Sequence, residues 1–109
     1  MSTHRPETRY RVNFPVYLTW QAKDGTIRRA LGKCRNISAS GAMVETDYPL
    51  DRHTGVIVES DSFGRMGHAT IRYCAREMMK YNIGVMFTAA LGLSDNIRKK
   101  IFEKAIQEV

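Results

Sequence analysis

The stretch Val12–Trp20 reads VNFPVYLTW, and its alternation decides the fold class. An apolar residue stands at every second position from Val12 to Trp20. Such a strict period of two indicates a half-buried β-strand. Pro15 falls on the other face of this strand. Because proline has no amide hydrogen to donate to a neighbouring strand, it indicates an edge or a bulge at that point.

A tight turn and a second strand follow. The tripeptide KDG at 23–25 indicates a hairpin, because Asp-Gly suits turns that need a positive φ. The second strand is expected over residues 26–37. One of its faces carries Ala30, Gly32 and Cys34, whose small side chains suit the inside of a tightly curved sheet.

Four more strand-like runs separated by turn signals complete the expected sheet. They cover residues 42–46, 56–58, 65–76 and 81–87. In the run 65–76, alternation is expected to place two sets of side chains on opposite faces: Ile71, Tyr73 and Ala75 on one, and Arg72, Cys74 and Arg76 on the other. Six short strands favour a closed or nearly closed six-stranded antiparallel β-barrel. Closure also disposes of unpaired strand edges.

The last segment, 94–109, changes to a helical period. Ser94 suits an N-cap, and Asp95 suits the positive end of a helix dipole. The apolar residues fall on one half of a helical wheel: Ile97, Ile101, Phe102, Ala105, Ile106 and Val109. We therefore expect an all-β fold with a C-terminal amphipathic helix of about four turns. The helix either covers a barrel mouth or binds a partner.

Length and composition favour a single globular domain, divided into a flexible leader (1–11), the barrel (12–93) and the helix (94–109). The chain has 109 residues, 43% hydrophobic and 26% charged. No apolar run approaches the roughly 20 residues that a membrane-spanning helix needs. The polar start has no secretory signal, so we expect a cytoplasmic protein.

The cysteines and histidines give no metal signal. Cys34 and Cys74 are expected to be reduced and buried. Their spacing to the three histidines does not suggest zinc.

The positive charge is concentrated in the first third of the chain. The net charge is +6, and residues 1–35 hold eight lysines and arginines against two acidic residues, whereas residues 36–109 hold nine of each sign. A localised positive field raises the local concentration of an anionic ligand. A solvated basic face that aids solubility is the alternative interpretation.

Two polar motifs carry the groups that bind a phosphorylated, base-bearing ligand. Arg5-x-x-x-Arg9 offers guanidiniums, which bind phosphate through paired N–H bonds, stack on flat rings and pair with the edge of guanine. Asn36-x-Ser38-x-x-Gly41 offers an amide for a base edge, a hydroxyl, and a glycine that permits close backbone approach. Taken singly, the motifs also fit two solvated arginines and an ordinary turn.

Antiparallel pairing brings the two motifs together. The first motif immediately precedes the first strand, and the second motif follows the second strand. A hairpin between these strands places the start of one beside the end of the other. We therefore expect Arg9 and Asn36 to be neighbours at one rim of the barrel.

With these motifs and the run YNIGVMF at 81–87, nearly the whole chain resembles a PilZ domain, the bacterial receptor module for cyclic di-GMP. The resemblance implies a six-stranded antiparallel barrel, commonly with a C-terminal helix. It also implies roles in holding cyclic di-GMP. Arg5 and Arg9 would hold a guanine and the phosphates, and the opposite side would be lined by Asn36, Ser38 and Gly41.

The chain departs from the family pattern at two positions. The family often has aspartate in place of Asn36, and an aspartate accepts from two guanine donors where an amide has one acceptor oxygen. His4 stands where another arginine is frequent, which bears on whether one ligand or a stacked pair binds. Arg11 and Arg35 are further candidates for phosphate contacts.

The resemblance therefore implies a cyclic di-GMP sensor that signals to a downstream protein partner, without catalytic residues, metal or cofactor. The alternatives are a ligand-independent PilZ-like adaptor and a single-stranded nucleic-acid binder that uses the basic first third. Both motifs are present, which argues against the adaptor, and a nucleic-acid polymer is the less favoured ligand.

Overall fold

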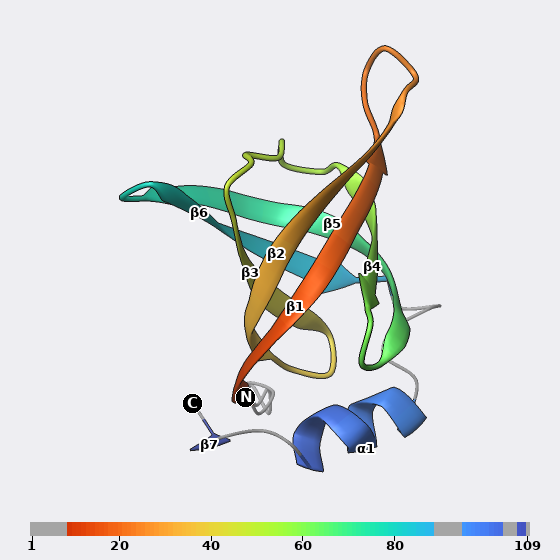
Figure 1. Cartoon of the computed structure of the whole chain (residues 1–109), viewed down its shortest axis with the longest axis vertical. Helices are drawn as coiled ribbons and strands as arrows, with labels where there is room; N and C mark the ends of the chain where they lie inside the picture. The colour runs from red at the N-terminus through yellow and green to blue at the C-terminus, as the bar shows by residue number, and fades with distance from the viewer. Residues whose placement is uncertain (1–8, 89–94, 104–106, 109) are drawn as a thin grey trace, which may run out of the picture.

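The computed structural model describes residues 9–88, 95–103 and 107–108. Six strands form the barrel: β1 (Tyr10–Gln21), β2 (Ile27–Ile37), β3 (Gly41–Thr46), β4 (Gly55–Ser60), β5 (Gly64–Glu77) and β6 (Lys80–Phe87). Their order is β2-β3-β6-β5-β4-β1, and β2 also pairs with β1, which closes the sheet (Figure 1). Every neighbouring pair is antiparallel. The expected six-stranded barrel is confirmed.

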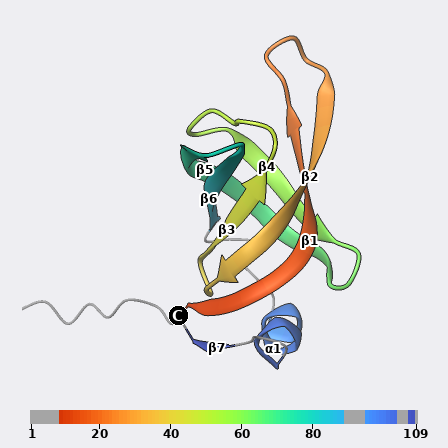
Figure 2. The ribbon, with the colours of Figure 1, turned by 60° about the vertical axis from the view of Figure 1, so that its left-hand side comes forward.

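The β1–β2 hairpin forms the long arm that projects from one end of the barrel in Figures 1 and 2. Gly25 has a φ of 90°, as the Asp-Gly signal predicts. The amide of Ala22 donates to the carbonyl of Thr26 at 2.8 Å and closes the turn. The hydroxyl of Thr26 donates to Asp24 Oδ1 at 2.7 Å, and this bond, with a second from the Thr26 amide, lowers the pKa of the Asp24 carboxyl.

The core follows the alternation of β1 and β2. Val16 and Leu18 are fully buried, and Cys34 is 1% exposed. A Cβ added at Gly32 would lie 2.6 Å from Val44 Cγ1, so the small face of β2 allows close packing on β3. Burial raises the pKa of the Cys34 thiol to about 12. Cys74 is only partly buried, and neither cysteine forms a disulfide.

A β-bulge in β5 overturns the expected alternation of that strand. The register with β6 passes from Ile71↔Val85 to Tyr73↔Gly84, so Arg72 has no residue opposite it. As a result Arg72 and Tyr73 are both exposed, while Cys74 packs against the core. The prediction that Tyr73 shares a face with Ile71 is wrong, because one extra residue reverses the faces beyond it.

The C-terminal helix α1 (Asp95–Glu103) is shorter than predicted. Gln107–Glu108 form a short strand, β7, which pairs with the start of β1. The prediction that the helix extends through these residues is wrong, because their backbone bonds to β1 instead. Ile101 is 1% exposed and belongs to the core, so α1 covers the end of the barrel where β1 begins (Figures 1 and 2).

The remaining expectations for the two ends of the chain are settled only in part. Tyr10 and Arg11 belong to β1, so the leader ends before residue 11. Five residues of the expected helix lie outside the described residues: Ser94, Lys104, Ala105, Ile106 and Val109.

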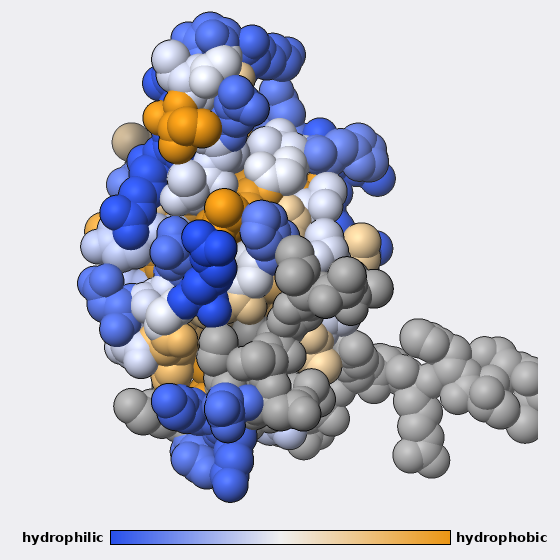
Figure 3. All heavy atoms as spheres, turned by 90° about the vertical axis from the view of Figure 1, so that its right-hand side faces the viewer, coloured by the Kyte–Doolittle hydropathy of each residue, from blue (hydrophilic) through white to orange (hydrophobic). Residues whose placement is uncertain are grey.

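On the face seen in Figure 3 hydrophilic side chains predominate, and apolar ones emerge in small separate patches. Within the described residues, no helix is long and apolar enough to cross a membrane.

Candidate ligand-binding site

Arg9 and Asn36 meet where β1 begins and β2 ends. The pairing of Arg11 with Asn36 sets the two chain segments side by side. Arg9 Nη1 donates a hydrogen bond to Asn36 Oδ1 at 3.1 Å. The sequence-based expectation that these two residues are neighbours is confirmed.

Ser38 and Gly41 build the turn that follows Asn36. The Ser38 amide donates to the Gly41 carbonyl at 2.8 Å, and the Gly41 amide donates to Ser38 Oγ at 3.2 Å. Ser38 is 2% exposed, so its hydroxyl serves the turn. A Cβ at Gly41 would lie 2.7 Å from the Val85 carbonyl oxygen, so this glycine lets β3 approach β6 closely.

A cavity of about 320 Å³ opens beside this turn, on the outer face of β3, β6 and β5. It is lined by Arg9, Ser40, Gly41, Ala42, Arg52, Arg72, Tyr73, Gly84, Val85 and Met86. Three of these residues are arginines, one before β1, one in the β3–β4 connection and one on β5, and none of the described lining residues is acidic. Three guanidiniums around one concavity favour an anionic ligand.

Four of the predicted site residues lie at or next to this cavity. Arg9 and Gly41 line it. Asn36 does not line the cavity but accepts the hydrogen bond from Arg9, which does. Ser38 is buried in the turn next to the cavity.

The remaining candidates lie elsewhere. Arg11 and Arg35 are exposed beside Asn36 in β1 and β2 and do not line the cavity. His4 and Arg5 lie outside the described residues.

Sequence reasoning missed Arg52, Arg72 and Tyr73. Arg52 lies in the β3–β4 connection, where no strand pattern predicts its position. The bulge that turns Arg72 and Tyr73 outward interrupts an otherwise regular alternation. The sequence gives one weak sign of this bulge: after Ile71, the next two alternate positions hold the less apolar residues Tyr73 and Ala75.

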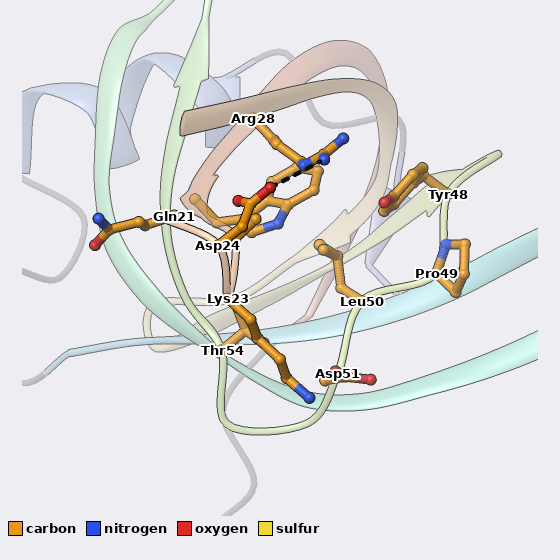
Figure 4. A pocket seen from close by; sticks show the side chains of 11 residues that line it. Gln21, Lys23, Asp24, Arg28, Tyr48, Pro49, Leu50, Asp51 and Thr54 are labelled. Atoms are coloured by element: carbon orange, nitrogen blue, oxygen red, sulfur yellow. Dashed lines mark ion pairs between the residues drawn. The ribbon is translucent and has the colours of Figure 1, made fainter. Parts of the chain in front are cut away.

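A second concavity, of about 450 Å³, lies between the β1–β2 turn and the β3–β4 connection (Figure 4). Its charges are mixed: Lys23 and Arg28 face Asp24 and Asp51, and Arg28 pairs with Asp24 at 3.9 Å. β1 is twelve residues long, so this turn lies about 40 Å along the strand from Arg9. Although it is larger, its charges offset one another, and we take the three-arginine cavity as the candidate site.

Among residues 9–88, 95–103 and 107–108, no three histidine, cysteine, aspartate or glutamate side chains are placed to hold a metal ion.

No protein-family model matches the sequence. No curated protein matches it either. Among solved structures, the "PilZ domain with c-di-GMP of YcgR from Escherichia coli" is similar, with a TM-score of 0.65 and 11% sequence identity. The likeness covers 94% of this chain and 92% of that chain. The resemblance drawn from the motifs is thereby confirmed at the level of the fold: this chain has the fold of a PilZ domain.

Proposed function

We propose that this chain is a binding module for cyclic di-GMP, that the three-arginine cavity holds the ligand, and that the module has no catalytic role. The observation that carries the proposal is the Arg9–Asn36 hydrogen bond beside this cavity. This bond joins the last residue of the first motif to the first residue of the second motif. Two further guanidiniums, those of Arg52 and Arg72, line the same cavity. The similar PilZ domain of YcgR, whose structure contains c-di-GMP, supports the choice of ligand.

The chemistry of the site suits a guanine dinucleotide. A guanidinium holds a phosphate through two parallel N–H bonds, or pairs with O6 and N7 of guanine. The partner of Arg9 is a neutral amide, so Arg9 is positioned while its charge remains available. A phosphate oxygen, being charged, is a stronger acceptor than that amide.

Binding would reach beyond the cavity through Arg5, four residues before Arg9. In this proposal the ligand is held by both Arg5 and Arg9 through charge-assisted contacts. The leader bound in this way changes the surface offered to a downstream protein, and we place this signalling in the cytoplasm.

Titration calorimetry with cyclic di-GMP tests this function. Wild type should bind saturably, and Arg9→Ala and Arg5→Ala should each weaken binding about 10- to 100-fold, the loss expected for a charge-assisted contact. Arg29→Ala is the matched control, because its guanidinium carbon lies 3.9 Å from the centroid of the Tyr17 ring and Arg29 does not line the cavity.

Two results would contradict the proposal. If wild type and Arg9→Ala give the same heats, the cavity does not bind cyclic di-GMP, and the ligand-independent adaptor is favoured. If long oligonucleotides bind more tightly than cyclic di-GMP, with a steep dependence on salt, the chain is a nucleic-acid binder.

A further inference from the structure

The bulge in β5 creates a feature that neither motif contains. It sets two consecutive side chains, Arg72 and Tyr73, outward between buried Ile71 and core-packed Cys74. Both outward residues line the three-arginine cavity. Bulges commonly redirect side chains beside functional sites.

Gly84 holds the Tyr73 ring in place. A Cβ at Gly84 would lie 2.0 Å from Tyr73 Cε2 and 2.5 Å from Cδ2, so the ring lies directly against the backbone of β6. The tyrosine is nevertheless 46% exposed. An aromatic ring that is supported by backbone and open to a cavity is suited to stacking on a flat ligand group.

The sheet register relates this ring to the Asn36 end of the site. Asn36 pairs with Met43, Met43 with Gly84, and Gly84 with Tyr73. These residues therefore form one row across four strands. At the usual strand spacing, Asn36 and Tyr73 lie about 14 Å apart along the curved sheet. Arg9 stands at the Asn36 end of this row, and Arg72 adjoins Tyr73 at the other.

From this arrangement we infer that Tyr73 stacks on a purine base of the bound dinucleotide, and that Arg72 and Arg52 hold a phosphate at that end. The inference rests on the proposed function, and it adds a second half to the site. The first half, Arg9 and Asn36, holds one nucleotide, and the second half receives the other. A ligand with two purine bases and two phosphates uses both halves, whereas a mononucleotide uses one.

Calorimetry on variants of the second half tests the inference. Tyr73→Leu should weaken cyclic di-GMP binding about 5- to 150-fold, the range expected for loss of one base–aromatic stack. Tyr73→Phe should restore most of that affinity, because the ring is kept. Gly84→Ala should mimic Tyr73→Leu by displacing the ring, and Arg72→Gln should weaken binding about tenfold or more.

Arg76→Gln is the matched control on the same strand. Arg76 is exposed, donates to the Met78 carbonyl at 3.3 Å and does not line the cavity, so its loss should leave affinity unchanged. Circular dichroism melting of each variant checks that the barrel remains folded. Inorganic pyrophosphate is the second probe, and its binding should not respond to Tyr73→Leu, since it has no base to stack.

Proton NMR gives a direct readout of stacking. The ring resonances of Tyr73 should move upfield when cyclic di-GMP is added, because a stacked base shields them. The inference is overturned if Tyr73→Leu binds as wild type while Arg9→Ala still loses binding, an outcome that leaves the proposed function intact. It is also overturned if Tyr73→Leu weakens pyrophosphate and cyclic di-GMP equally. Failure of wild type to bind would overturn both proposals.

Discussion

At the scale of single residues, Asn36 sets the electrostatic state of the site. Its amide oxygen accepts from Arg9 without neutralising it. A carboxylate at this position would pair with Arg9, but exposed ion pairs contribute only about 0–1 kcal/mol. Hydrogen bonds from two guanine donors to a charged acceptor contribute about 1.5–3 kcal/mol. The hydrogen bonds from guanine therefore contribute more to binding than the competing pair with Arg9 takes away.

Asn36→Asp should therefore bind cyclic di-GMP about tenfold more tightly than wild type. The reason is that the carboxylate offers guanine two acceptor oxygens, at the cost of a weak competing pair with Arg9. Calorimetry at constant salt measures the change. Weaker binding by Asn36→Asp would show that Asn36 acts mainly by positioning Arg9.

Cys34 is a second residue with a testable electrostatic consequence. Burial raises the pKa of its thiol from 9.0 to about 12, so the folded protein keeps the proton after the unfolded chain has lost it. The stabilising contribution is full below pH 9 and is lost as the pH rises toward 12. Between these values the free energy of unfolding should fall by about 1.4 kcal/mol per pH unit from this group.

Urea unfolding of wild type and Cys34→Ala at pH 8 to 10.5 isolates this contribution, because other titrating groups are common to both proteins. The stability difference between the two should shrink by about 2 kcal/mol over this range. A difference that is constant with pH would show that the Cys34 thiol ionises in the folded protein.

At the scale of elements, the turn between β2 and β3 connects stability to the site. Ser38 and Gly41 satisfy each other's polar groups beneath the cavity, and Gly41 lets β3 lie close to β6. The sequence predicts this turn because asparagine, serine and glycine favour it. The local sequence cannot show that the Ser38 hydroxyl points inward, because the burial of Ser38 depends on strands that are distant in sequence.

Gly41→Ala should destabilise the fold by about 1–3 kcal/mol, because its Cβ would meet the Val85 carbonyl oxygen at 2.7 Å. Gly55→Ala is the matched control, because a Cβ there would have no neighbour within 4 Å and its φ is not positive. Urea unfolding measures both variants. Equal stability of the two would contradict the close approach of β3 and β6.

The bulge in β5 and the end of α1 mark where prediction from local pattern fails. An alternating pattern predicts strands well, because each strand of the barrel has one face on the core. It does not reveal an extra residue in one strand, so it does not predict that Tyr73 faces outward beside Arg72. The helical period of the last segment likewise did not reveal that Gln107–Glu108 pair with β1, a contact between the two ends of the chain.

At the scale of the whole molecule, closure of the barrel brings the distant segments of the site together. Arg9 precedes β1, Arg52 lies in the connection between β3 and β4, and Arg72 lies on β5. All three nevertheless line one cavity. Only the Arg9–Asn36 contact could be predicted from sequence, because a single hairpin determines it. The other two arginines depend on the strand order β3-β6-β5, which no local pattern specifies.

The location of the ligand on the barrel tests the account most directly, because the two concavities lie at opposite ends of β1. Backbone NMR shifts should be followed as cyclic di-GMP is added to isotope-labelled wild-type protein. The account predicts that the largest shifts cluster at Asn36, Ser40, Tyr73 and Gly84. Shifts that instead cluster at Lys23 and Thr54, or the absence of any shift at saturating ligand, would contradict it.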